Sequence, residues 1–314
     1  MSPFPRRQSR RCDRCPASAV EAPVDGMMAR DRILVTVKTY PELSTTYGET
    51  VCTAGIRQDG TWVRLYPVPF RRLGESEQYR LYDWITCPLV RHSRDPRPES
   101  YRPTGEIERV DHVGTADNWR ERRQLLLGHR QAHGSLSELI EAAKNNISSL
   151  AVFKPARLIR FEWEAADREW DASKLEAVRA ITGQPDLFDD QSWSRTFRVV
   201  DKVPYNFYYH IEDADGRLSR MRILEWQLGA LYRNCLRSAD GDETEALAKV
   251  RQKYFNEFAT TDLHFFLGTT LAWHTRAPNP WTIVGVLPIP HQTQQDLFVR
   301  EVEGAPCAGG AALG

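Results

Sequence analysis

Apolar and polar residues alternate along the chain from residue 32 to about residue 114. Alternation with a period of two predicts strands, because successive side chains then point to opposite faces. Between the second and third segments, Asp59-Gly60 is typical of a tight hairpin turn. Five short strands in about eighty residues favour a small barrel or a strongly bent sheet. The predicted strands span residues 32–40, 49–56, 61–70, 79–90 and 106–114.

The pattern after residue 114 alternates between helices and strands. Residues 115–130 and 135–146 have helical spacing, and the second of these segments begins with Ser135 and Glu138 in a capping-box arrangement. A polar stretch at residues 181–195 interrupts the periodicity and predicts a linker loop. Helices are expected at residues 221–236 and 243–259, and strands at 154–166, 203–213, 263–273 and 280–290.

These elements predict an α+β fold with two modules. Residues 27–180 are expected to form a small N-terminal β-barrel-like module with helices, and residues 196–290 a smaller α+β module. The loop at residues 181–195 would join the two modules. Residues 1–26 are rich in Arg, Pro, Ser and Ala without a hydrophobic period, which is typical of a disordered leader. Residues 291–314 end in small residues and are expected to form a flexible tail.

Composition narrows the class of protein only slightly. The chain has 42 basic and 42 acidic side chains, so it carries no strong overall field for nucleic acid. Its six cysteines are irregularly spaced, which favours free thiols in a reduced, cytoplasmic setting. No apolar run approaches the length of a membrane span. The expectation is a cytoplasmic protein of bacterial type.

A repeated pentapeptide is the most specific motif of the sequence. It reads QPDLF at residues 184–188 and QQDLF at residues 294–298. Both copies resemble the short peptides by which bacterial polymerases and repair factors bind the sliding DNA clamp. In that class the Leu and Phe fill an apolar pocket, and the Gln forms hydrogen bonds at its rim. The resemblance implies a clamp-binding role for Gln184, Asp186, Leu187, Phe188, Gln294, Asp296, Leu297 and Phe298.

The pentapeptides have a plain alternative interpretation. Each Leu-Phe pair could anchor a loop to the protein's own core. The resemblance covers ten of the 314 residues, and it implies nothing about the fold or about catalysis.

Aromatic and basic residues alternate on one predicted strand. Trp62, Arg64 and Tyr66 would share one face of the strand at residues 61–70, as Lys38 and Tyr40 would on the first strand. Rings that stack on bases, with guanidinium groups that bind phosphate, are typical of a nucleic-acid platform. A solvated sheet face with cations packed over rings is the alternative. The predicted nucleic-acid-binding residues are Lys38, Tyr40, Trp62, Arg64, Tyr66, Arg71, Arg72, Arg97 and Arg102.

Other chemistry has little support in the sequence. Cys12 and Cys15 have finger-like spacing but no second ligand pair follows, so no metal site is predicted. Nucleotide-binding and hydrolase motifs are missing, and no cofactor or catalytic residue is predicted.

The leading hypothesis is a DNA-associated accessory factor recruited to the sliding clamp in repair, replication or defence against foreign DNA. DNA or RNA would be a second partner. An enzyme acting on nucleic acid or nucleotides in a cleft between the modules is one alternative, and a protein–protein adaptor is another.

Overall fold

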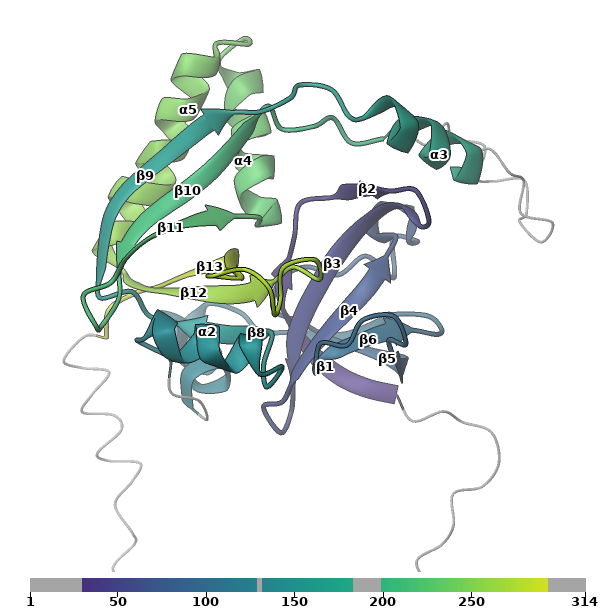
Figure 1. Cartoon of the computed structure of the whole chain (residues 1–314), viewed down its shortest axis with the longest axis horizontal. Coiled ribbons are helices and arrows are strands. Elements are labelled where there is room, and N and C mark those ends of the chain that lie inside the picture. The colour runs from purple at the N-terminus through teal and green to yellow at the C-terminus, as the bar shows by residue number, and fades with distance from the viewer. Residues whose placement is uncertain (1–29, 129–131, 183–198, 293–314) are drawn as a thin grey trace, which may run out of the picture.

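The computed structural model describes residues 30–128, 132–182 and 199–292. It confirms the predicted α+β fold, with an N-terminal barrel and a second sheet that carries helices (Figure 1). The two parts, which we call the barrel module and the sheet module, pack directly on each other.

The barrel module is closed by its first strand. Strand β1 forms antiparallel pairs with both β3 and β5, so the path β1-β3-β4-β6-β5 returns to its start. This closure confirms the predicted β-barrel. Strands β2 and β7 extend it by pairing with β3 and β5. The strands are β1 (Arg30–Lys38), β2 (Glu42–Ser44), β3 (Gly48–Arg57), β4 (Trp62–Val68), β5 (Asp83–Arg91), β6 (Ser100–Pro103) and β7 (Glu108–His112).

The sheet module contains a six-stranded sheet in the order β8-β12-β13-β11-β10-β9. Its pairs are antiparallel except for the short parallel pair between β11 and β13. The tight turn at Asp215-Gly216 joins β10 to β11, with Gly216 at a φ of 79°. The strands are β8 (Leu150–Phe153), β9 (Arg157–Ala165), β10 (Tyr205–Glu212), β11 (Leu218–Ile223), β12 (Asp262–Thr269) and β13 (Trp281–Ile289).

Helices cover one face of this sheet. Helices α2 (Leu136–Lys144), α4 (Trp226–Ser238) and α5 (Glu243–Arg251) bury their apolar sides against it, and η4 (Gln252–Glu257) and η5 (Phe258–Thr260) continue α5. Ser135 caps α2 as predicted, because its hydroxyl accepts a hydrogen bond from the Glu138 backbone N–H. Helix α3 (Ala172–Thr182) contacts β2 and β3 of the barrel. Helix α1 (Ala116–Arg123) and the π-helical segment η2 (Gln124–Gly128) link the modules, and η1 (Phe70–Arg72) follows β4.

One apolar cluster joins the two modules. It combines outward-facing barrel residues such as Leu34 and Ile56 with Val152, Phe266 and Val284 from the far face of the sheet. Each of these side chains is at most 5% exposed, so the junction is a packed core rather than a hinge. A pocket at this junction therefore has walls held in fixed positions.

The structure groups some strands differently from the sequence analysis. Strands β8 and β9 both belong to the second sheet, where they form its two edges, so the sheets divide before residue 150. The sequence suggested a boundary between modules at residues 181–195. Strand β11 covers residues that were expected to begin a helix, and α3 was not predicted. Pairing between distant strands decided these cases, and local periodicity carries no information about it.

Candidate functional site between the two modules

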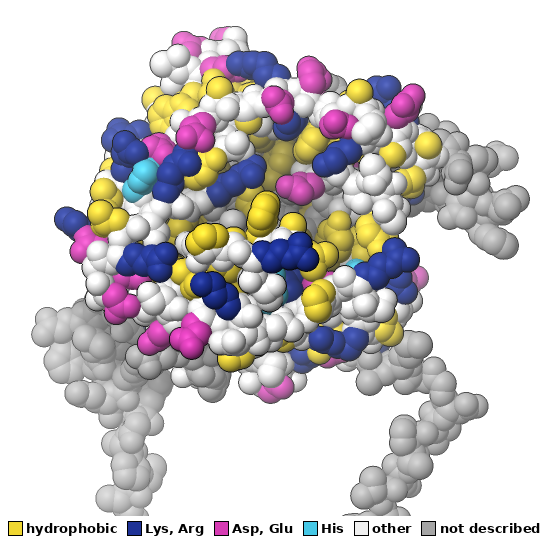
Figure 2. Space-filling model, in the orientation of Figure 1, with side chains coloured by type: hydrophobic (Ala, Val, Ile, Leu, Met, Phe, Trp, Pro, Cys, Tyr) yellow, Lys and Arg dark blue, Asp and Glu magenta, His cyan; other side chains and the backbone are white. Residues whose placement is uncertain are grey.

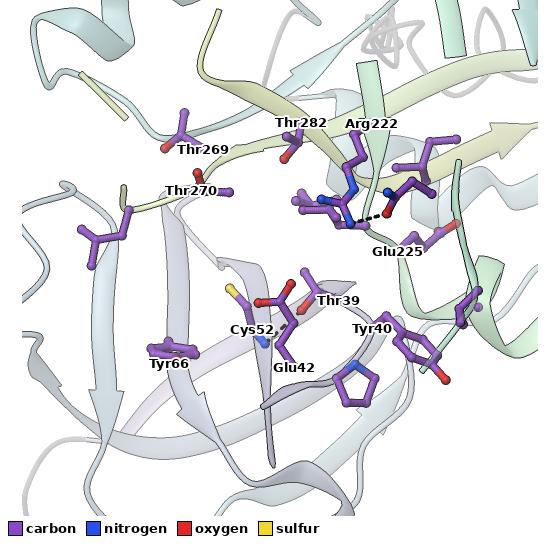
Figure 3. A pocket seen from close by; sticks show the side chains of 18 of the residues that line it. Thr39, Tyr40, Glu42, Cys52, Tyr66, Arg222, Glu225, Thr269, Thr270 and Thr282 are labelled. Atoms are coloured by element: carbon purple, nitrogen blue, oxygen red, sulfur yellow. Dashed lines mark hydrogen bonds between the residues drawn. The ribbon is translucent and has the colours of Figure 1, made fainter. Parts of the chain in front are cut away.

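A pocket of about 600 Å³ lies between the barrel module and the sheet module. Figure 2 shows a recess with apolar side chains inside it and Lys or Arg side chains around it. In Figure 3, Tyr40 and Tyr66 lie on the barrel side of this space, and Arg222 and Thr282 lie on the opposite side. Residues from both modules therefore form the walls, as the hypothesis of a cleft between modules requires.

Aromatic side chains line both walls. On the barrel side, Tyr47 and Tyr66 meet edge to face with ring centroids 6.0 Å apart, and His92 stacks on Tyr66 at 6.5 Å. On the sheet side, Trp170 and Phe207 line the same space. The Trp170 indole is fixed because its N–H donates to the Val200 carbonyl at 2.7 Å. Such opposed aromatic walls suit a flat ligand that can stack.

Tyr40 follows strand β1 of the barrel module and is held in place by the sheet module. Its backbone N–H donates to the Leu224 carbonyl at 2.9 Å, and its hydroxyl donates to the Asp201 carbonyl at 3.0 Å. Its ring lies against α4 where Gly229 has no side chain, and a Cβ there would overlap the ring. Burial raises the pKa of Tyr40, so the hydroxyl stays protonated at neutral pH. A glycine in α4 thus makes room for one wall of the pocket.

Two buried arginines of the barrel connect it to the sheet module. Arg64, which is 3% exposed, donates from Nη2 to the Ser149 carbonyl at 2.8 Å and to Ser149 Oγ at 3.0 Å. The buried Glu99 carboxylate accepts hydrogen bonds from Ser149 N–H at 3.0 Å and from Ser149 Oγ at 2.6 Å. Burial lowers the pKa of Arg64. The Arg64 Nε atom has no hydrogen-bond partner among the described residues.

The second buried arginine, Arg97, forms a two-point ion pair with Asp95. The distances are 2.9 Å from Nε to Oδ1 and 2.6 Å from Nη2 to Oδ2. Burial opposes ionisation of Asp95, but the hydrogen bonds and charge of Arg97 outweigh it and hold the pKa at about 2. Arg97 also donates to the Thr269 carbonyl in the sheet module. We call Arg64, Asp95, Arg97, Glu99 and Ser149 the inter-module clasp.

Basic side chains outnumber acidic ones on the pocket walls, whereas the two are equal in number in the whole chain. Arg94, Lys202 and Arg222 join Arg64 and Arg97, whereas Glu42, Asp95 and Glu225 are the acidic groups. Arg94 and Arg222 are exposed, and Arg222 donates to Asn206 Oδ1 at 2.6 Å. Cations at the entrance of an apolar pocket favour a ligand that carries both a flat ring and a negative charge.

Glu225 is a buried carboxyl group in the pocket wall. It is 5% exposed and accepts hydrogen bonds from the Tyr254 hydroxyl at 2.6 Å and the Val286 backbone N–H at 3.0 Å. Burial raises its pKa to about 7, although these hydrogen bonds act in the opposite direction. Glu225 therefore changes charge near neutral pH inside the folded protein.

The predicted nucleic-acid-binding residues fall into two groups. Tyr40, Arg64, Tyr66 and Arg97 line the pocket. The others lie elsewhere: Lys38 Nζ is buried over the rings of Phe70 and Trp226, Trp62 packs on Phe266, Arg71 pairs with Glu49, and Arg72 and Arg102 are exposed. Both pentapeptides, at residues 184–188 and 294–298, lie outside the described residues.

Sequence reasoning missed the wall supplied by the sheet module. Trp170, Phe207, Arg222 and Glu225 were not candidates. The alternation of Tyr205, Phe207 and Tyr209 on one strand was a detectable signal for a core face, and these side chains do pack with the helices of the sheet module. Nothing in the sequence indicated that Phe207 also reaches a pocket beside the barrel. Within the described residues no group of three or more His, Cys, Asp or Glu could hold a metal ion. No described helix has the length and hydropathy to span a membrane.

Fold and pocket together define a two-module α+β protein with a ligand-sized cavity at the module junction. The chain belongs to the family described as "Domain of unknown function (DUF8757)", which matches residues 130–302. A second family, "Domain of unknown function (DUF8758)", matches residues 29–128, which include the barrel. The two matches meet close to the division between the sheets.

Comparison with other proteins adds little to this family membership. No curated protein is significantly similar to the chain in sequence. A solved murine DNA-binding protein bound to double-stranded DNA aligns with 85% of this chain and 98% of its own, with a TM-score of 0.28 and 11% identity. A TM-score this low supports no argument about fold or function.

Proposed function

We propose that the protein binds nucleic acid and holds one nucleotide in the pocket between its modules. The observation that supports this most is the pocket of about 600 Å³ with aromatic rings on both walls and arginines beside them. The volume lies within the range of about 300–1,000 Å³ that is usual for small-ligand sites. A nucleotide offers the matching chemistry, since its base can stack on rings and its phosphate can pair with cations.

The placement of the cations supports a ligand that is one unit of a strand. Arg94 and Arg222 are exposed at the pocket, so they can contact phosphates that continue beyond it. Arg64 and Arg97 are committed to the clasp and shape the inner wall. A base inside and a backbone outside would therefore meet different groups of the same site.

Binding to a labelled single-stranded oligonucleotide, followed by fluorescence anisotropy, tests this proposal. Tyr66→Ala and Trp170→Ala should each weaken binding about tenfold, because stacking one base on an aromatic ring contributes about 1–3 kcal/mol. Tyr208→Ala is the matched control. Tyr208 lies on β10 with the Arg220 guanidinium over its ring, and it is not part of the pocket lining. Thermal melts of each variant exclude unfolding as the cause. Equal affinities for all four proteins, or no binding by the wild type, would contradict the proposal.

We also propose that the pentapeptides recruit the protein to a sliding DNA clamp. The support is the sequence itself, which contains the Gln-x-Asp-Leu-Phe pattern twice. Such short peptides bind through two anchor side chains, and two copies can replace each other, so both pairs of anchors are removed together. A pull-down with the clamp should fail after Leu187→Ala and Phe188→Ala are combined with Leu297→Ala and Phe298→Ala. Val299→Ala is the control, and equal recovery of mutant and wild type would refute recruitment.

A further inference from the structure

The loop between β12 and β13 presents two large apolar side chains to solvent beside the pocket. Leu271 is 50% exposed and Trp273 is 61% exposed. Leu271 also lines the pocket, together with its neighbour Thr270. Among the exposed large hydrophobic residues that the structure describes, Leu271 is the one that lines the pocket, and Trp273 follows it by two residues. The others are Val110, Ile147, Ile159 and Leu218, in other parts of the chain. An exposed Trp next to a pocket is therefore unlike the isolated apolar residues elsewhere on the surface.

This loop is firmly anchored beneath its exposed side chains. The ring of His274 is 3% exposed and is hydrogen-bonded at both nitrogens, to Thr269 Oγ1 and to Asn146 Oδ1, each at 2.9 Å. The Trp273 carbonyl accepts from the backbone N–H groups of Arg276 and Ala277, at 3.2 and 3.1 Å. The backbone at Trp273 is thus held in a turn, so the indole remains exposed without the loop having to rearrange.

We propose that Leu271 and Trp273 form a wedge that enters a nucleic-acid duplex while one of its bases occupies the pocket. This inference rests on the proposed function, and it specifies the substrate as a duplex with an extruded nucleotide. Removing a base from the stack costs free energy, and apolar side chains inserted at the gap recover part of this cost. The wedge and the pocket mouth share Leu271, so both events can occur at one site.

Charge beside the wedge fits a duplex partner. Arg276 is exposed three residues after Trp273, and Arg94 is exposed on the barrel side of the pocket. Cations close to an apolar wedge can contact the phosphates that flank an opened base step. A protein partner would use the same apolar residues, but it would not change the stacking of a base.

A duplex with one 2-aminopurine at a mismatch tests the wedge, because the fluorescence of this base rises when it leaves the stack. Wild-type protein should raise the fluorescence and bind this duplex, whereas Trp273→Ala should lose the rise and bind about tenfold more weakly. Both proteins should bind a single strand with the same affinity, since Trp273 lies outside the pocket lining. Leu218→Ala, which removes another exposed residue far from the loop in sequence, should match the wild type in every assay.

The outcomes separate this inference from the proposed function. If the wild type binds single strands but leaves 2-aminopurine fluorescence unchanged, the wedge is wrong and the pocket proposal stands. If Trp273→Ala behaves as the wild type on the duplex, the wedge is also wrong. If no protein binds either single strand or duplex, the proposed function fails together with the wedge.

Discussion

The inter-module clasp and a second group of charges on strands β9–β11 use similar residues in different surroundings. In the clasp, Arg64 and Arg97 are 3% and 6% exposed. In the strand group, Arg220 forms ion pairs with Glu162 and Glu164. The side chains of Arg220 and Glu162 are 35% and 23% exposed. Burial magnifies the cost of an unmatched charge, whereas water screens the exposed pairs. The clasp should therefore stabilise the arrangement of the modules, and the strand group should contribute little.

Removing the guanidinium of Arg64 should have the largest effect on stability. Arg64→Ala removes a buried cation that acts electrostatically on Glu99, and it deletes the two hydrogen bonds to Ser149, the residue that also binds Glu99. Loss of one partner from a buried charged network typically costs about 3–5 kcal/mol. Urea unfolding followed by circular dichroism measures this loss. A loss below about 1 kcal/mol would mean that the clasp is energetically no different from exposed pairs.

A smaller, pH-dependent effect is expected from Glu225. Its pKa is about 7 in the folded protein against an ordinary value of 4.5, so the folded state retains a proton that the unfolded state releases. Stability should therefore fall as the pH rises from about 4.5 to about 7. Glu225→Gln keeps an acceptor for Val286 N–H and should flatten this part of the profile by up to about 3 kcal/mol. Parallel profiles for wild type and variant in urea unfolding would contradict the assignment.

The smallest effect is expected in the strand group. Glu162→Gln removes the charge that pairs with Arg160 and Arg220 on the outer sheet surface. Exposed ion pairs contribute about 0–1 kcal/mol, so the unfolding midpoint in urea should hardly move. Raised salt should reduce even this difference. A loss as large as that of Arg64→Ala would remove the contrast between buried and exposed charge.

Much of the fold could be predicted where structure is local. The alternating segments gave β1, β3, β4 and β5 close to their positions, and the turn at Asp59-Gly60 is present with Gly60 at a φ of 81°. The membership of β8 and β9 in the second sheet could not be predicted, because each pairs with a strand that is distant in sequence. Strand β2 has three residues and is too short to show a two-residue period, and β6 and β8, with four residues each, are at the lower limit.

The candidate site shows the same division between local and distant information. Arg64 and Tyr66 were found because their spacing puts them on one side of one strand. The spacing did not reveal that this side faces a second module. An open platform for nucleic acid, or alternatively a solvated sheet face, was expected where the structure has a buried arginine and a walled pocket. Glu225 was not a candidate, because nothing in its local sequence indicates burial.

Photo-crosslinking of an iodouracil-containing single strand tests the central claim most directly, because it locates the base on the protein. We expect the crosslinked peptides to contain Tyr40, Tyr66 or Trp170, and crosslinking to fall when an unlabelled strand competes. Crosslinks found only on other surfaces, such as the outer face of β9–β11, would contradict a nucleotide site between the modules.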